Sequence, residues 1–120
     1  MKLPQIDPAR LEEEWRADEE VLQSLSANGD RPWITRAVDV SFRGSEEGLA
    51  KLSDASKSFG LIIIDKEIDA QGNVSLFLER EMKADASSIK ALTKKCLQIA
   101  ALFDLEYEGW GCEAKPGSMT

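Results

Sequence analysis

The sequence predicts an α+β fold in which one leading helix precedes four strands and two further helices. Three observations predict it. Apolar residues recur at three- and four-residue steps in three segments, which is the spacing of a buried helix face. They alternate with polar residues in other, shorter segments, as in half-buried strands, and turn-forming residues separate the segments. The chain has 120 residues, 42% of them apolar, so we expect a single domain over residues 1–120.

The leading helix is predicted over about residues 7–29. Asp7 can accept hydrogen bonds from the first free amides, and Pro8 suits the first helical position because it has no N–H to leave unpaired. Asn28-Gly29 provides a left-handed stop. The apolar stripe between these signals consists of Leu11, Trp15, Leu22 and Leu25. Because this stripe needs a surface, the open face of the sheet is one candidate for it.

The first strand is predicted over residues 33–43, and a second helix follows it. Ile34, Val38, Val40 and Phe42 alternate onto one face, and Arg36 breaks the pattern. Ser45 can cap the helix that follows. The buried stripe of that helix is predicted to be Leu49, Leu52, Ala55 and Phe59, with Gly60 as its end.

The second and third strands are predicted to form a hairpin. The second runs over residues 61–68, and residues 70–73 have the composition of a turn. In the third strand, one face consists of Val74, Leu76 and Leu78, and the other of Ser75, Phe77 and Glu79.

The last helix has the most regular periodicity in the chain. Asp85 is its candidate cap, and its apolar residues are Ile89, Leu92, Cys96, Ile99 and Phe103. Residues 105–112 are predicted to be the last strand, and the chain from Lys115-Pro116-Gly117 onward is predicted to be frayed. The order βαββαβ over about residues 33–113 predicts a ferredoxin-like two-layer sandwich with a four-stranded antiparallel sheet.

Composition excludes several kinds of chemistry. The chain has no histidine, which excludes histidine bases, histidine-containing triads and histidine metal ligands. Two cysteines do not make a zinc site by themselves, so we predict no metal and no cofactor. Cys96 falls on an apolar helix face and is interpreted as a core residue, whereas Cys112 could be exposed.

The charge balance is strongly acidic. With 15 basic and 22 acidic residues the net charge is −7, which argues against direct binding to nucleic acid and fits a partner with a basic surface. Residues 1–30 hold eight of the acids and three of the bases. The N-terminus does not resemble a signal peptide, and no apolar run is long enough to span a membrane, so we expect a cytoplasmic protein.

Paired carboxylates are the remaining candidates for catalysis or metal binding. Glu106 and Glu108, and likewise Asp65, Glu67 and Asp69, alternate along predicted strands, so each set points to one side. No histidine, calcium-loop spacing or phosphate-binding glycine loop accompanies them. We therefore predict no catalytic residue and a protein that is not an enzyme.

The most specific segment is residues 103–111, with the sequence Phe-Asp-Leu-Glu-Tyr-Glu-Gly-Trp-Gly. It resembles the closing motif of the RraB family, the regulator of ribonuclease activity B proteins, also called ribonuclease E inhibitor proteins. The predicted element order and the acidic balance agree with that family over roughly residues 7–113. Some members continue into a long acidic tail that this sequence lacks, so an inhibition that needs the tail would be absent.

The resemblance implies a cytosolic ferredoxin-like protein without catalysis of its own. It would bind ribonuclease E, which initiates messenger RNA decay, at the non-catalytic region, and lower its activity. The alternative is a ferredoxin-like module that self-associates or binds a small ligand without regulating a nuclease. We expect a monomer or a weak dimer, because edge strands in this fold pair readily.

Two groups of residues are predicted to bind the partner. Glu106, Glu108 and Trp110 would share one face of the last strand, with the indole as an aromatic anchor. The second group lies on the leading helix and consists of Glu12, Glu13, Glu19 and Glu20. Two structural interpretations remain open. Trp110 would pack beneath the leading helix against Trp15 or Leu22, and the acidic ridge would be an ordinary solvated helix face.

Overall fold

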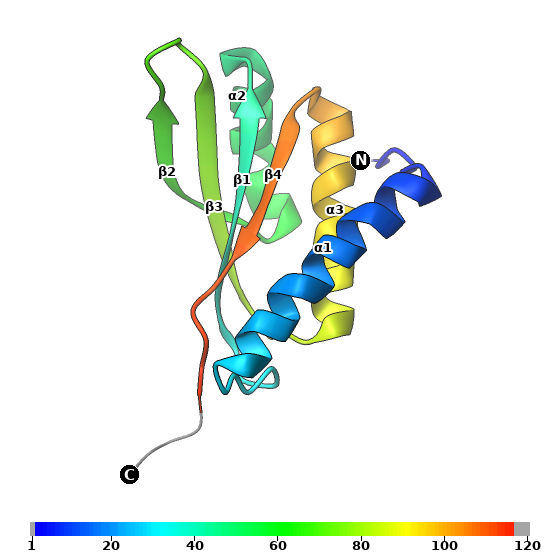
Figure 1. Ribbon diagram of the computed structural model, residues 1–120. Helices are drawn as coiled ribbons and strands as arrows, with labels where there is room; N and C mark the ends of the chain where they lie inside the picture. The colour runs from blue at the N-terminus through cyan, green and yellow to red at the C-terminus, as the bar shows by residue number, and fades with distance from the viewer. Residues whose placement is uncertain (1, 117–120) are drawn as a thin grey trace.

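The computed structural model describes residues 2–116 and has the predicted order of elements (Figure 1). The helices are α1 (Pro8–Ala27), α2 (Glu46–Ala55), the short 3₁₀ helix η1 (Ser56–Phe59) and α3 (Ala86–Phe103). The strands are β1 (Arg36–Gly44), β2 (Ile62–Ile68), β3 (Val74–Met82) and β4 (Glu106–Gly111). They pair antiparallel in the order β2-β3-β1-β4, which confirms the ferredoxin-like prediction.

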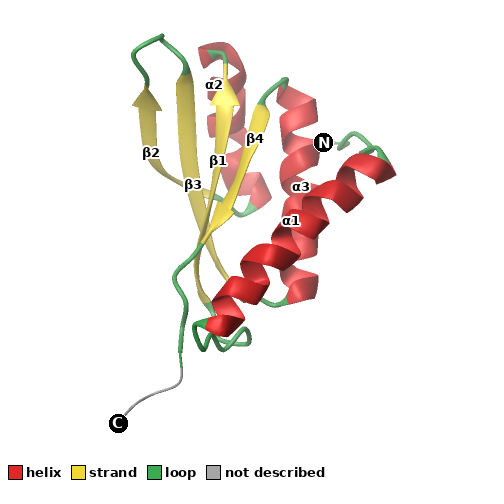
Figure 2. Cartoon of the chain, in the orientation of Figure 1, coloured by secondary structure: helices red, strands yellow, loops and turns green. Residues whose placement is uncertain are grey.

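The molecule has a sheet layer and a helix layer (Figure 2). Helices α2 and α3 lie on one face of the sheet, where they pack against β1, β3 and β4. Within residues 2–116 no helix covers the opposite face, which we call the open face. None of the helices described is long and apolar enough to cross a bilayer.

The core lies between the sheet and α2 and α3, and it contains the residues that periodicity predicted. Its largest fully enclosed side chains are Phe42, Leu52, Leu78, Ile89, Ile99, Val38, Val40, Thr93 and Cys96. The ring of Tyr107 in β4 packs against that of Phe42 in β1, with centroids 5.5 Å apart. The apolar residues that alternate in the strands and those that recur at three- and four-residue steps in α3 all face this core. The two periodicities therefore predicted its composition correctly.

Three predicted helix caps are confirmed. The side chains of Asp7, Ser45 and Asp85 accept hydrogen bonds from backbone amides at the starts of α1, α2 and α3, at 3.2, 3.0 and 2.8 Å. The second helix is shorter than predicted. It ends at Ala55 and tightens into η1 before Gly60, whose φ of 72° is left-handed.

Helix α1 does not cover the open face, so that candidate position was wrong. It crosses α3 on the helical side of the sheet, beside the β4 edge (Figure 1). The indole N–H of Trp15 donates to the carbonyl of Lys90 in α3 at 3.2 Å, and the Lys90 ammonium lies 5.2 Å from the ring centroid. The apolar stripe of α1 therefore extends the helix layer instead of closing the sandwich.

Strand β1 begins at Arg36, three residues later than predicted, and Arg36 is part of its buried face. The arginine is 2% exposed and lies on the same face of β1 as Val38, so the alternation of buried residues continues through it. Its guanidinium pairs with Asp30 at 2.6 Å, and the two side chains are 1% and 3% exposed. It also donates to the carbonyls of Arg31 and Ile34 at 2.7 and 2.9 Å. These acceptors make the burial of the charge possible.

The C-terminal residues of the described chain are bound to the same cluster. The Lys115 amide donates to the Asp30 carboxylate at 2.7 Å, the Arg31 amide donates to the Lys115 carbonyl at 3.0 Å, and Asp30 and Pro116 form an isolated β-bridge. The prediction of fraying was therefore wrong for Lys115 and Pro116, and its remainder lies outside the described residues. Burial alone would raise the pKa of Asp30, but hydrogen bonds from Lys115 and Arg36 outweigh it and lower the pKa.

Candidate functional site

The closing strand contains a β-bulge that changes the direction of its side chains. Phe42 of β1 pairs with Tyr107, while the preceding Ser41 pairs with Gly109, so Glu108 is an extra residue in β4. Gly109 has a φ of 116°, which favours glycine. Because of the extra residue, Tyr107 and Trp110 both point to the helical side. The prediction that Trp110 shares a face with Glu106 and Glu108 was wrong, because it assumed unbroken alternation.

Trp110 is held by a carboxylate of α1. Its indole N–H donates to Oδ1 of Asp18 at 2.8 Å, and the hydroxyl of Thr93 in α3 donates to Oδ2. The indole is partly buried against the core, and its bond to Asp18 places it next to the leading helix, which agrees with that part of the structural interpretation. Its polar partner is Asp18, which that interpretation did not name. Because its N–H is already bound, the indole of Trp110 has a structural role: together with Asp18 and Thr93 it joins β4 to α1 and α3.

Asp18 is the buried acid of this junction. Its side chain is 6% exposed. Burial raises the pKa of this carboxyl, the hydrogen bonds from Thr93 and Trp110 act in the opposite direction, and the nearby charge of Glu14 adds to the rise. Sequence reasoning missed Asp18 as a structural residue. Its position on the apolar stripe, midway between Trp15 and Leu22, was the available signal.

Glu106 and Glu108 lie together on the open face. Glu106 is paired in register with Arg43 of β1, and Glu108 accepts a hydrogen bond from the Ser75 hydroxyl at 3.2 Å. Both glutamates are exposed. Arg43 itself pairs with Asp69 at 3.0 Å, so its charge is shared with an aspartate of the β2–β3 turn. These two predicted partner-binding residues therefore belong to one surface, without Trp110.

Further acids occupy the centre of the open face. Asp39 of β1 lies directly opposite Glu79 of β3 in the sheet register. Like charges directly opposite one another destabilise a sheet. On its other side Asp39 faces Gly111, where an added Cβ would lie 3.5 Å from the carboxylate. We use the name acidic sheet face for the following residues: Asp39, Glu79, Glu106 and Glu108. Sequence reasoning placed Glu79 on this face but assigned it no role.

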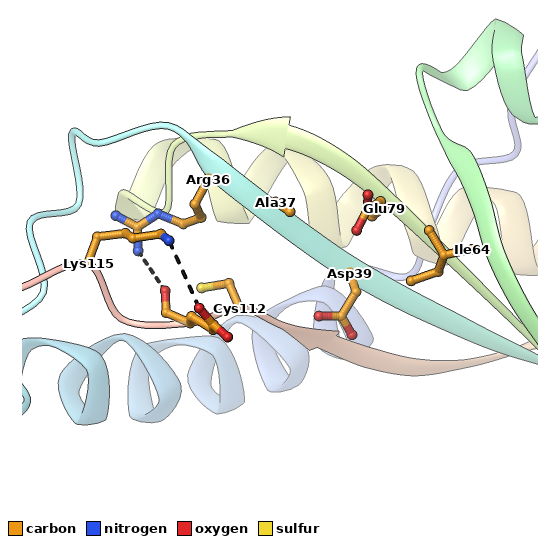
Figure 3. A pocket seen from close by; sticks show the side chains of 8 residues that line it. Arg36, Ala37, Asp39, Ile64, Glu79, Cys112 and Lys115 are labelled. Carbon is orange, nitrogen blue, oxygen red and sulfur yellow. Dashed lines mark hydrogen bonds and ion pairs between the residues drawn. The ribbon is translucent and has the colours of Figure 1, made fainter.

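A hollow of about 480 Å³ lies at one end of the acidic sheet face (Figure 3). Asp39 and Glu79 line it from adjacent strands, with Ile64 of β2 near them, and Arg36 lies at its other end with Cys112 and Lys115. Arg36 has few hydrogen-bond donors left for a ligand, because it binds Asp30, backbone carbonyls of the preceding loop and, at 3.4 Å, the Glu113 carbonyl. Arg36 therefore offers little to an anionic ligand in the hollow.

The other carboxylate set does not form a metal site. Asp65 and Glu67 point to the open side of β2, because they pair with Phe77 and Ser75 of β3. Asp69 lies beyond the strand and accepts hydrogen bonds from the amides of the turn, which lower the pKa of its carboxyl. Across residues 2–116 no group of three or more acids and cysteines is arranged to hold an ion.

The two cysteines are not activated thiols. Burial raises the pKa of the Cys96 thiol to about 12, in agreement with its interpretation as a core residue. Cys112 is half-buried, and burial raises the pKa of its thiol as well. Both therefore remain protonated at neutral pH.

The acidic ridge of α1 is a second, separate surface. Its residues are all exposed and are Glu12, Glu13, Glu19 and Glu20. They lie on the helix surface turned away from α3, with Arg16 among them, so they are on the helical side of the sheet. The structure therefore does not bring the ridge together with the acidic sheet face.

These features define a ferredoxin-like α+β protein with an added N-terminal helix and a free, acidic sheet face. The family model of RraB, described as Regulator of ribonuclease activity B, matches residues 15–112. The chain belongs to the RraB family, a family of regulators of ribonuclease activity, as the closing motif had indicated. The matched segment includes that motif, Asp18 and the whole sheet, whereas Glu12 and Glu13 precede it. A comparison with curated proteins gave no match.

Proposed function

We propose that this chain binds ribonuclease E outside its catalytic centre and lowers its activity, so that it slows RNA decay in the cytoplasm. It acts by docking and catalyses no reaction itself. The observation that carries the proposal is the RraB match over residues 15–112, which covers every element that forms the open face. The partner region is the non-catalytic part of the nuclease.

The acidic sheet face supports docking onto protein and not onto RNA. Ferredoxin-like sheets that bind RNA present aromatic and basic residues to the bases and phosphates. Here the corresponding face presents Asp39 opposite Glu79, with Glu106 and Glu108 beside β1. Phe77 is the aromatic residue of β3 on this face, and the charge of Arg43 is already paired with Asp69. Phosphates would be repelled from it, whereas a basic segment of a protein would relieve the repulsion between Asp39 and Glu79. The chain therefore acts on the nuclease and does not compete for its substrate.

The ridge on α1 has a different role in this proposal. Glu12, Glu13, Glu19 and Glu20 are exposed, and charges at the rim of an interface mainly raise the association rate. We assign them to the electrostatic attraction of the basic partner. Trp110 remains in the proposed binding region as a supporting residue, because its bond to Asp18 fixes β4 and hence the position of Glu106 and Glu108.

A binding experiment with charge variants tests the proposal. The non-catalytic region of ribonuclease E is immobilised, and binding of the chain is measured at low and at high salt. We expect wild type to bind at low salt and Glu106→Lys/Glu108→Lys to bind at least about tenfold more weakly. Glu47→Lys/Asp54→Lys, at two exposed positions on α2, is the matched control with the same charge change and should bind like wild type. Absence of binding by wild type would refute the proposal.

A further inference from the structure

Strand β2 exposes an unusual amount of aliphatic surface. All seven of its residues are exposed, although the strand includes Ile62, Ile63, Ile64 and Ile68, which are 66, 39, 48 and 62% exposed. The strand lies at the edge of the sheet, with β3 as its one strand neighbour among residues 2–116 (Figure 1). Proteins usually shorten, charge or cover such an edge, because its free backbone groups can pair with another chain.

The edge carries charged residues and a bulge, but no other described strand covers it. A register shift between Ile63 and Asp65 bends the strand, and the Asp65 carboxylate accepts a hydrogen bond from the Lys66 amide at 2.8 Å. Helices α2 and α3 pack over β1, β3 and β4, so they do not shield the isoleucines of β2. Backbone pairing and aliphatic burial are therefore both available along about 23 Å of strand, at roughly 3.3 Å per residue.

The side chains of β2 define what would fit beside it. Ile63 and Ile68 point to the helical side, where they pair with Leu78 and Val74 of β3. Asp65 and Glu67 point to the open side, next to the acidic sheet face. Residues directly opposite in neighbouring strands share a face. A strand added along residues 65–68 would thus meet Asp65 and Glu67 on the open face. On the helical face it would meet Ile63 and Ile68 with Lys66 between them, and Ile62 lies on the open face opposite Glu79.

We propose that β2 binds an extended segment of the partner protein by strand addition, and that basic and aliphatic residues alternate in this segment. Its basic side chains lie against Asp65 and Glu67, and its aliphatic side chains cover Ile63 and Ile68. Main-chain hydrogen bonds supply affinity, and the alternation supplies specificity. This inference rests on the proposed function, since it specifies how the nuclease would be held.

A second copy of the chain fits this edge poorly. Two β2 strands related by a two-fold axis would pair antiparallel. Centred on Lys66, the pair would place Asp65 opposite Glu67, and centred on either acid it would place that acid opposite itself. These three registers set like charges face to face, in a protein whose net charge is already −7. A second copy is therefore disfavoured wherever Asp65 and Glu67 take part in the pairing, whereas a register centred on Ile64 would avoid these contacts. A basic partner removes this repulsion.

The first test uses two synthetic capped peptides as probes, each as long as β2 (7 residues). In one peptide Arg and Val alternate, and in the other the same residues stand in separate blocks. Binding is followed by NMR with the isotope-labelled full chain. We expect the alternating peptide to shift the amide resonances of β2 and to bind several-fold more tightly than the block peptide. Equal binding of the two peptides, or shifts confined to α1, would overturn the inference.

Variants separate strand addition from general charge attraction. Glu67→Lys should weaken binding of the alternating peptide about tenfold or more, whereas Asp54→Lys on α2 carries the same charge change and should leave binding unchanged. Ile68→Thr should also weaken it, because it removes aliphatic contact without changing charge. The melting temperatures of all variants are measured alongside, and unchanged peptide binding in folded Glu67→Lys and Ile68→Thr contradicts the inference.

The nuclease itself distinguishes the two proposals. If wild type fails to bind ribonuclease E, the proposed function fails, and the peptide experiment still decides whether β2 accepts a strand. If the β2 variants bind the nuclease like wild type while Glu106→Lys/Glu108→Lys does not, strand addition is wrong and the proposed function stands. A concentration-dependent dimer in sedimentation that Glu67→Lys strengthens would show that a second copy occupies the edge, which also overturns the inference.

Discussion

The indole N–H of Trp110 and the carboxylate of Asp18 form a 2.8 Å hydrogen bond that joins the last strand to the first helix across most of the sequence. Thr93 of α3 binds the other oxygen of the same carboxylate. One acid thus links α1, α3 and β4. The junction explains why the closing motif contains a tryptophan, and it sets the position of the strand that carries Glu106 and Glu108.

Replacing Asp18 tests the junction. Asp18→Ala leaves the Trp110 N–H and the Thr93 hydroxyl without their acceptor, and should lower the free energy of unfolding by about 1–3 kcal/mol. Asp18→Asn keeps an acceptor oxygen and should cost less than about 1 kcal/mol at neutral pH. Denaturant unfolding measures both. Equal losses in the two variants would show that the hydrogen bonds contribute little.

The difference in stability between Asp18→Asn and wild type should depend on pH in a definite direction. The pKa of Asp18 is raised above its ordinary value of 3.8, mainly by burial. Its contribution to stability is therefore fully present below about pH 3.8 and is lost as the pH rises through the raised value. Relative to wild type, Asp18→Asn should become more stable as the pH increases from 4 toward 7. Unfolding curves across this range give the difference, and a constant or opposite trend would contradict the assignment.

The two glycines around Trp110 should respond differently to alanine. Gly109 has a φ of 116°, so Gly109→Ala strains the bulge and should cost about 1–2 kcal/mol of stability. Gly111 lacks a positive φ, and its added Cβ would meet Asp39 at an ordinary 3.5 Å. Gly111→Ala should thus stay within about 0.5 kcal/mol of wild type. Thermal and denaturant unfolding compare them, and similar costs would argue against the bulge.

The buried ion pair of Arg36 and Asp30 should be sensitive to removal of one partner. Arg36→Met leaves the Asp30 carboxylate enclosed with the Lys115 amide but without its counter-charge, and should cost about 3–5 kcal/mol. The same variant should also loosen Lys115 and Pro116, which hydrogen exchange of the Lys115 amide would report. A loss below about 1 kcal/mol would mean that the pair is not buried in solution.

Most of the fold could be predicted because local patterns agree with the final packing. Alternation in β1 and β3 and the periodicity of α3 fix which side chains face the core, and the ferredoxin-like order follows from the succession of elements. The position of α1 could not be predicted, because its stripe fits either side of a sheet. The burial of Arg36 was also hidden, since its acceptors Asp30 and Glu113 lie in different segments of the chain.

The candidate site was only partly visible in the sequence. Glu106 and Glu108 were placed on one surface correctly, because both precede Gly109. Trp110 was misplaced, since a glycine within a strand does not reveal whether it bulges. The opposition of Asp39 and Glu79 depends on strand register, which a single sequence does not give. Their alternation with core residues was the signal that could have identified them.

The most direct test of the central claim is the rate at which ribonuclease E cleaves RNA as increasing amounts of the chain are added. We predict that wild type slows cleavage in a saturable, salt-sensitive way and that Glu106→Lys/Glu108→Lys slows it much less. Glu47→Lys/Asp54→Lys should inhibit like wild type, and the chain alone should leave the RNA intact. Cleavage that continues at the same rate at saturating wild-type protein, or RNA cut by the chain alone, would contradict the account.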